Sequence, residues 1–113
     1  MPLRIISIAL LIGFASSANA KGFADKSPLS TPDMAVCTAA AMKSGQGFDL
    51  YKRWVGALEA RYKIIYSNLS PKEVDSYTAE RVMDKKRSLN KKGIQTSSAF
   101  KNFYSVNCSD STP

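Results

Sequence analysis

The sequence predicts an all-α protein: a small four-helix bundle closed by one disulfide, following a cleaved signal peptide. Three observations indicate this fold. Apolar residues recur at three- and four-residue steps across residues 48–69, the segment 70–73 (SPKE) has the pattern of a helix start, and two cysteines lie near opposite ends of the helical region. Short connections between the predicted helices favour antiparallel neighbours, as in a bundle.

The N-terminal segment 1–20 has the three parts of a secretory signal peptide. Arg4 supplies a positive charge, residues 5–14 form an apolar run, and Ala18-Asn19-Ala20 matches the pattern before a cleavage site. The run is shorter than the roughly 20 residues that a membrane-spanning helix needs, so we expect cleavage rather than an uncleaved anchor. We therefore predict a periplasmic or secreted protein with no transmembrane segment in the rest of the chain.

Removal of residues 1–20 leaves 93 residues with 15 basic and 9 acidic side chains, a net charge of +6. This length fits one domain with a modest core. A positive balance favours anionic partners. Because we expect the chain outside the cytoplasm, acidic proteins or anionic envelope surfaces fit better than nucleic acid.

The predicted domain organisation has three parts after the signal peptide. Residues 21–30 contain glycine, proline and charged residues without periodicity, which predicts a flexible N-terminal arm. Residues 31–108 form the helical domain. Residues 109–113 are predicted to be a frayed C-terminus.

The first predicted helix covers residues 32–44. Thr31 is the expected N-cap, Pro32 suits the first helical position, and Asp33 favours the positive end of the helix dipole. The segment is rich in alanine, so another backbone can approach it closely. Gly45-Gln46-Gly47 ends the helix and turns the chain.

The second predicted helix, residues 48–68, is the most amphipathic segment. Nine apolar residues fall within an arc of roughly 120°, and three more widen the arc to roughly 200°. One neighbour cannot cover so wide an arc, so we expect this helix to be central. The nine are Phe48, Tyr51, Trp54, Val55, Leu58, Tyr62, Ile65, Tyr66 and Leu69, and the three are Leu50, Ala57 and Ile64.

The third and fourth predicted helices cover residues 71–90 and 98–107. The segment 70–73 is a capping box with proline at the first helical position. The third helix has a thin apolar stripe, so we expect it to cover one side of the second helix and to remain largely solvated. Gly93 ends the third helix, and Thr96, Ser97 or Ser98 can cap the fourth.

Cys37 and Cys108 are the two cysteines of the chain, and an even count in an oxidising compartment predicts a disulfide. The bond would place the fourth helix beside the first, with the second and third helices forming a hairpin between them. A metal site would need more ligands, and the chain has no histidine. No phosphate-binding loop is present, and we expect neither a metal nor another cofactor.

Arg61 is the most informative polar residue because it falls inside the apolar arc of the second helix. An arginine there must extend to solvent or find a partner, since an unpaired buried charge is costly. Candidate partners are the carboxylates Asp33, Asp75, Glu80 and Asp84. The alternative to a structural role is an anion-recognition site in a groove.

Further candidate binding residues are basic or aromatic. The segment 85–92 has the highest density of charged residues in the chain. It is either a solvated helix end or a binding surface for an acidic partner. Two tyrosines at the edge of the apolar arc are either core residues or part of a recognition surface. The candidates are Arg61, Tyr62, Tyr66, Arg81, Lys85, Lys86, Arg87, Lys91 and Lys92.

Catalytic patterns are sparse, because without histidine there is no ordinary triad and no imidazole base. The sequence therefore predicts a small exported, non-enzymatic protein that docks a protein partner in the cell envelope, of the inhibitor, immunity or chaperone type. One alternative is an electrostatic binder of an anionic polymer or membrane surface. Another is a minimal carboxylate-dependent cell-wall hydrolase using Glu59, Glu73 or Glu80.

Overall fold

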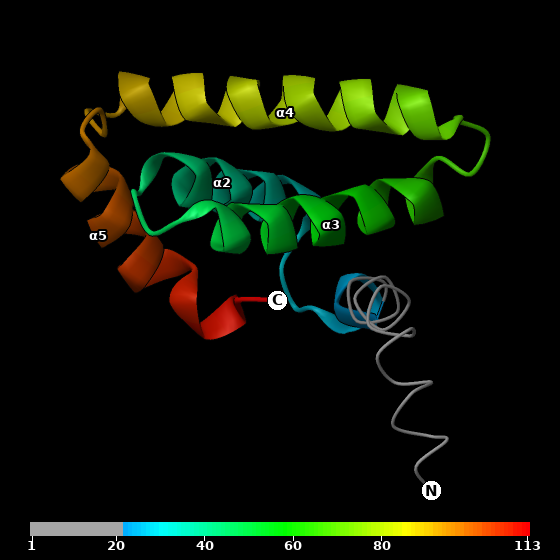
Figure 1. Ribbon diagram of the computed structural model, residues 1–113, viewed down its shortest axis with the longest axis horizontal. Helices are drawn as coiled ribbons and strands as arrows, with labels where there is room; N and C mark the ends of the chain where they lie inside the picture. The colour runs from blue at the N-terminus through cyan, green and yellow to red at the C-terminus, as the bar shows by residue number, and fades with distance from the viewer. Residues whose placement is uncertain (1–21) are drawn as a thin grey trace, which may run out of the picture.

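The structure, a computed structural model, describes residues 22–113, and all the regular secondary structure there is helical (Figure 1). The predicted signal peptide, residues 1–20, lies outside the described residues. The four predicted helices are confirmed, and a short 3₁₀ helix follows them. Their bounds are α2 Thr31–Lys43, α3 Phe48–Ile65, α4 Pro71–Lys91, α5 Ser97–Asn107 and η1 Ser109–Ser111.

Side-chain caps fix where three of the helices begin. The capping box at the start of α4 is confirmed: Glu73 N–H donates to Ser70 Oγ at 3.2 Å, and Ser70 N–H donates to Glu73 Oε1 at 2.8 Å. Thr96 caps α5. At α2 the cap is Ser30 rather than the expected Thr31, because Ser30 Oγ accepts from Asp33 N–H.

Helix α2 is the centre of the bundle. It packs against α3, α4 and α5, whereas α3 packs against α2 and α4. Seven of its thirteen residues are buried, and four of these seven are alanine. The prediction of a central α3 is therefore wrong. Sequence periodicity measures how wide an apolar arc is, and it does not measure how many helices the arc meets.

The apolar arc of α3 is only partly covered. Its buried residues are Trp54, Ala57, Leu58 and Tyr62, while Ile64 and Ile65 are exposed. Helix α3 also ends at Ile65, where the Tyr66 N–H donates to the Tyr62 carbonyl oxygen and the chain turns.

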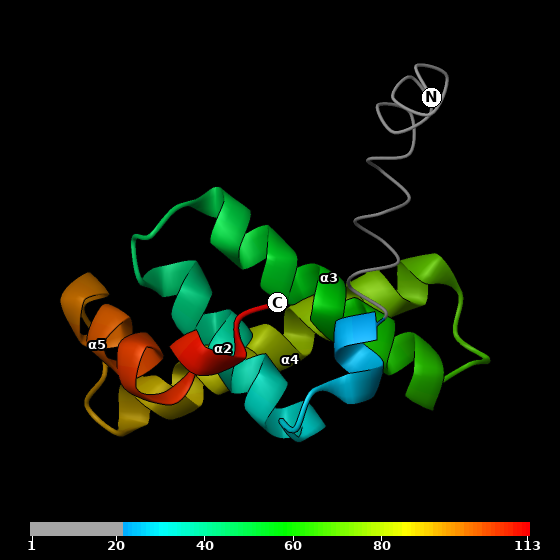
Figure 2. The same ribbon diagram turned by 90° about the horizontal axis from the view of Figure 1, so that it is seen from below.

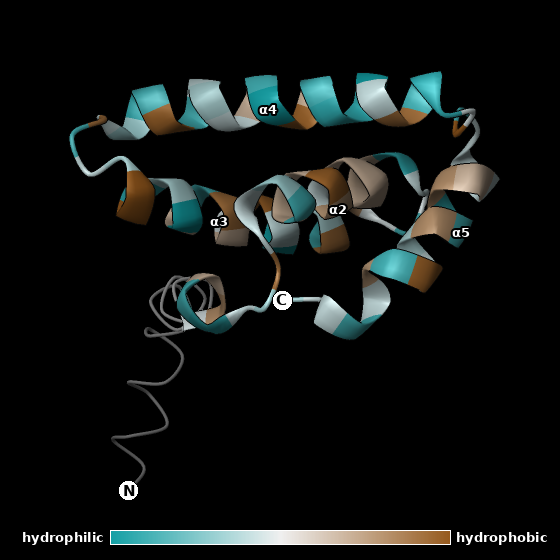
Figure 3. Cartoon of the chain, turned by 180° about the vertical axis from the view of Figure 1, so that it is seen from behind, coloured by the Kyte–Doolittle hydropathy of each residue, from teal (hydrophilic) through white to brown (hydrophobic). Residues whose placement is uncertain are grey.

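Helix α4 runs along one side of both α2 and α3 (Figure 1). Val74, Thr78, Val82 and Leu89 are its buried residues, which confirms the thin stripe. Thr78 can be buried because its hydroxyl donates to the Val74 carbonyl oxygen at 2.7 Å. Hydrophilic residues cover the outer side of α4 (Figure 3).

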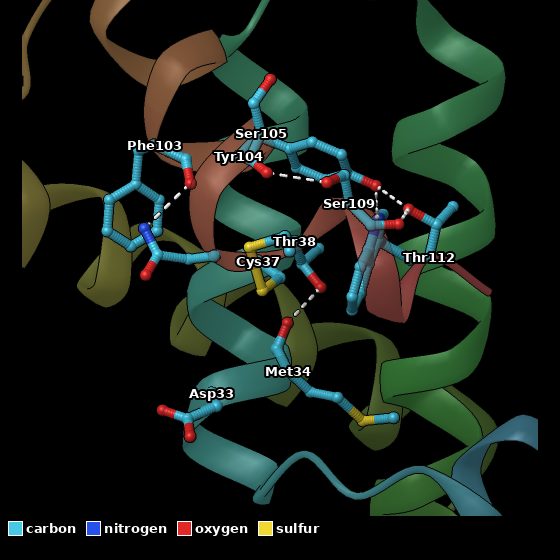
Figure 4. The surroundings of a disulfide bond; sticks show 12 residues. Asp33, Met34, Cys37, Thr38, Phe103, Tyr104, Ser105, Ser109 and Thr112 are labelled. Atoms are coloured by element: carbon cyan, nitrogen blue, oxygen red, sulfur yellow. Dashed lines mark hydrogen bonds between the residues drawn. A yellow bond between two sulfur atoms is a disulfide. The ribbon is translucent and has the colours of Figure 1, made fainter.

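The Cys37–Cys108 disulfide is present and joins α2 to the C-terminal end of α5, with 5.7 Å between the two Cα atoms. Both cysteines are buried. Figure 4 shows the disulfide and the side chains around it. The expected placement of α5 beside α2 is therefore confirmed.

Both ends of the described chain pack near Trp54, which is fully buried. Phe23 and Tyr104 each meet the indole edge to face, with ring centroids 6.0 and 6.1 Å away. The indole N–H donates to the Tyr104 hydroxyl at 2.8 Å, and this hydroxyl also bonds with Thr112 Oγ1. Figure 4 shows Tyr104 and Thr112 at this contact.

These contacts differ from the expected flexible arm at 21–30 and frayed end at 109–113. Residues 22–26 are helical, and Ala24 is buried. At the other end, Ser109–Ser111 form a 3₁₀ turn. The sequence pattern missed both segments because each is held by a few individual contacts, from Phe23 and Arg61 at one end and Thr112 at the other, rather than by a periodic apolar face.

Within residues 22–113, no helix has the length and apolar character needed to cross a membrane.

We predict that replacing Cys37 and Cys108 together by serine lowers the free energy of unfolding by about 4 kcal/mol. The disulfide closes a loop with a sequence separation of 71 residues, and most of the loss comes from the greater entropy of the unfolded chain. Urea unfolding of the oxidised native protein and of the double variant measures the difference. Reduction of the native protein should produce the same loss, and equal stability of both forms contradicts the prediction.

Candidate functional site

Three tyrosines, here called the tyrosine cluster, fill the seam between α3 and α4. Tyr62 lies on α3, Tyr66 is the C-cap residue directly after α3, and Tyr77 lies on α4. The ring of Tyr77 meets Tyr62 and Tyr66 in edge-to-face arrangements, with centroids 4.9 and 5.3 Å away. The Tyr66 and Tyr77 hydroxyl groups lie 3.4 Å apart. This geometry is the one that aromatic rings prefer.

Local structure brings the tyrosines together. Tyr62 and Tyr66 are four residues apart, so they lie one helical turn from each other on the same face. The chain then turns, and the Ser70–Glu73 capping box starts α4 at a fixed position, which sets Tyr77 opposite them.

The members of the cluster differ in exposure. Tyr62 is only 4% exposed, and burial together with Tyr77 raises its pKa to about 12. The sequence made Tyr62 a candidate binding residue, but its ring is part of the core and is not exposed to a partner. Tyr66 is 38% exposed and Tyr77 is half-buried. A hydrogen bond with Tyr66 raises the pKa of Tyr77, so the Tyr77 hydroxyl group is neutral near pH 7.

Arg81 lies over the tyrosine cluster and is held from two sides. Its guanidinium carbon is 5.3 Å from the centroid of the Tyr77 ring, within the range of a cation–π contact. Its Nη2 atom is 2.8 Å from Asp84 Oδ2. Asp84 also pairs with Arg87. The buried Nε of Arg81 has no hydrogen-bond partner among residues 22–113.

Several lysines follow Arg81 along α4. Lys85 and Lys92 lie four and eleven residues further on, which places them on the same side of the helix as Arg81. Lys86 lies about 140° round the helix from Arg81. Within the described part of the chain, the ion pairs involve Arg81 and Arg87, whereas Lys85, Lys86, Lys91 and Lys92 make none.

We call Tyr66, Tyr77, Arg81, Lys85 and Lys92 the α4 ridge. It combines exposed aromatic surface with cations on one side of one helix. Four of its five residues, Tyr66, Arg81, Lys85 and Lys92, are candidate binding residues predicted from the sequence. Tyr77 is the fifth, because the Arg81 guanidinium lies over its ring.

Arg61 does not belong to this surface. Its Nε donates to the Ala24 carbonyl oxygen at 2.9 Å. Its Nη1 donates to the Leu29 carbonyl oxygen at 3.3 Å and to Thr31 Oγ1 at 3.1 Å. Within residues 22–113, Arg61 forms no ion pair with any of the expected carboxylates. Arg61 instead fixes the chain before α2 onto α3.

Glu59 and Asp75 form a carboxyl pair across α3 and α4 that the sequence analysis missed. Burial and a hydrogen bond with Asp75 raise the pKa of Glu59 from 4.5 to about 7. Glycosidases keep their two carboxyl groups about 5 Å or more apart, to leave room for the glycosidic bond. The hydrolase alternative stays a prediction. Glu73 is engaged in the capping box.

No group of three or more histidine, cysteine, aspartate or glutamate side chains suited to a metal ion occurs in the part of the chain that the structure describes.

Comparison of the chain with protein-family models, curated proteins and solved structures found no match.

We predict that Arg61→Lys lowers the free energy of unfolding by about 2 kcal/mol, since a lysine ammonium cannot reproduce the fork of bonds to Ala24 and Leu29. Amide exchange in residues 22–29 should also become faster than in the native protein. Urea unfolding and hydrogen exchange measure the two effects. Arg53→Lys, at an exposed position of the same helix, is the control, and equal behaviour of both variants contradicts the assigned role.

We predict that the Glu59 carboxyl makes the protein less stable as pH rises from about 4.5 to about 7. The folded state holds the proton in this window while the unfolded chain has released it, so the free energy of unfolding falls with pH. Above pH 7 this contribution is constant.

Urea unfolding at several pH values tests this dependence. Glu59→Gln, which resembles the protonated carboxyl, should flatten the decline between pH 4.5 and 7. Glu80→Gln at an exposed position of α4 should leave the profile of the native protein unchanged. A profile that Glu59→Gln does not alter contradicts the prediction.

Proposed function

We propose that this chain is a small exported, non-enzymatic binding protein that docks an acidic protein partner in the cell envelope through the α4 ridge. The observation that carries the proposal is the stack of Arg81 on Tyr77, exposed at the edge of the bundle and fixed by Asp84.

Pre-organisation supports a docking role for this stack. Ordering a free arginine on binding costs rotamer entropy, and Arg81 is already ordered by its ion pair and its ring contact. Its side chain remains 38% exposed, so the guanidinium can still reach a partner. Tyrosine and arginine are also the residue types that most often dominate the binding energy of interfaces.

Charge supports an acidic partner. Lys85 and Lys92 extend the α4 ridge with cations that no described carboxylate pairs with. The whole chain has a net charge of +7. Such a field accelerates the approach of an acidic protein and selects against basic ones.

The signal-peptide pattern of residues 1–20 and the buried Cys37–Cys108 disulfide support a periplasmic or secreted location. Inhibitor, immunity and chaperone roles all use a rigid surface of this kind, and any of the three fits the proposed docking.

We predict that Arg81→Ala weakens retention of the partner about thirtyfold, the effect of losing an interface residue worth about 2 kcal/mol. Native protein immobilised on a resin is used to capture proteins from envelope extract, and each variant is then titrated with the purified partner. Arg87→Ala is the matched control, because it removes the same charge and the same kind of bond to Asp84 without a ring contact. We expect less than a threefold effect from it.

Two outcomes contradict the proposal. One is the absence of any protein retained by the native resin. The other is an equal loss from Arg81→Ala and Arg87→Ala together with a steep salt dependence, which is the behaviour of an electrostatic binder that responds to net charge alone.

A further inference from the structure

The start of α3 presents an aromatic side chain that the bundle does not use. Phe48 is 68% exposed. Beside it lies an open hollow of about 390 Å³, lined by Ala41, Met42, Gly45, Gly47, Phe48 and Tyr51. The lining is therefore apolar apart from backbone groups and the tyrosine hydroxyl.

Two glycines shape the turn that leads to Phe48. Gly45 has a φ of +74° and Gly47 a φ of +112°, in the region that side chains disfavour. A Cβ at Gly47 would meet no other atom within 4 Å. Glycine is therefore favoured there by the positive φ of the backbone and not by a lack of space. The turn ends α2 and directs Phe48 outward at the edge of the molecule, where Figure 2 shows the start of α3.

One cation lies beside this apolar surface, and two more are exposed within the same segment. The Lys52 ammonium lies 5.6 Å from the centroid of the Phe48 ring. Lys43 and Arg53 are also exposed, and Asp49 is the one acidic residue between positions 42 and 53. The local charge is therefore +2, and none of these cations forms an ion pair within residues 22–113.

We propose that the segment 42–53 docks on the surface of an anionic lipid bilayer. Phe48 inserts at the boundary between the headgroups and the acyl chains, and Lys43, Lys52 and Arg53 contact lipid phosphates. An aromatic side chain on an apolar surface, bordered by lysine or arginine, is the combination that interfacial membrane segments use. Charge complementarity identifies the lipid as anionic.

The size of the surface favours a bilayer over a protein. Taking about 200 Å² for a fully exposed phenylalanine, the Phe48 side chain exposes roughly 140 Å². A stable protein interface buries about 800 Å² on each partner. A single inserted ring with three cations needs no such area, because the bilayer surrounds whatever is inserted in it.

This surface is separate from the α4 ridge, since the two share no residue: the segment 42–53 contains the start of α3, whereas the ridge residue nearest to it in the sequence, Tyr66, follows the end of α3. The proposal therefore does not depend on the proposed protein partner. Loss of either surface should leave the other intact.

Sedimentation with lipid vesicles tests the proposal. The protein recovered after export, with its N-terminus defined by mass spectrometry, is mixed with vesicles of phosphatidylcholine alone or with one quarter phosphatidylglycerol. We expect binding to the vesicles that contain phosphatidylglycerol. Phe48→Ala should weaken it about tenfold or more, from the lost apolar transfer, and Lys52→Ala about fivefold, from the lost charge.

Val106→Ala is the matched control, because Val106 is 73% exposed on α5 and lies outside the segment 42–53. It should change binding less than twofold. All four proteins are compared in the same processed form, so a contribution from any residual N-terminal segment cancels. Every substituted side chain is exposed, and circular dichroism verifies that each variant is folded.

Three outcomes overturn the proposal. The first is the absence of binding to vesicles with phosphatidylglycerol. The second is binding that Phe48→Ala and Val106→Ala affect equally. The third is self-association of the native protein, abolished by Phe48→Ala without any vesicle binding, which would assign the surface to a second copy of the chain.

Discussion

Helix α2 can occupy the centre of the bundle because most of its buried side chains are small. Ala35, Ala39, Ala40 and Ala41 end at Cβ, so three other helices can pack closely against one. Interiors are packed to near-crystalline density, and larger side chains at these positions would force the neighbours apart. The close approach also lets Cys37 reach Cys108. Where α3 and α4 lie, and hence where the α4 ridge lies, follows from this packing.

The helices and the disulfide could be predicted from the sequence, because helix ends are marked by neighbouring residues and only one cysteine pairing is possible. Caps and glycines mark helix ends, and two cysteines allow one pairing. The sequence was insufficient for the packing of α2, since an alanine-rich helix has little amphipathic contrast. It was also insufficient for Arg61, whose partners are mainly backbone carbonyl oxygens that no side-chain pattern reveals. The Glu59–Asp75 pair depends on how two helices cross, which periodicity does not encode.

Arg61 and Arg81 show how one residue type takes different roles on neighbouring helices. Arg61 donates to two backbone carbonyl oxygens of the chain before α2 and to the Thr31 hydroxyl, so most of its partners are backbone atoms of this chain. Arg81 has a ring beneath it and a carboxylate beside it, and neither partner covers its outer edge. Position on a helical wheel treats both as polar residues near an apolar arc. Only the neighbouring elements decide which of the two is available to a partner.

The contacts of Trp54 have a consequence for the order in which the chain can fold. Its ring is covered from one direction by Phe23 and from another by Tyr104, whose hydroxyl bonds with Thr112. A chain threaded through a membrane from its N-terminus would therefore leave Trp54 partly uncovered until Tyr104, 81 residues beyond Phe23, had emerged. The native core would form after translocation rather than during it, and the disulfide would close in the compartment that oxidises it.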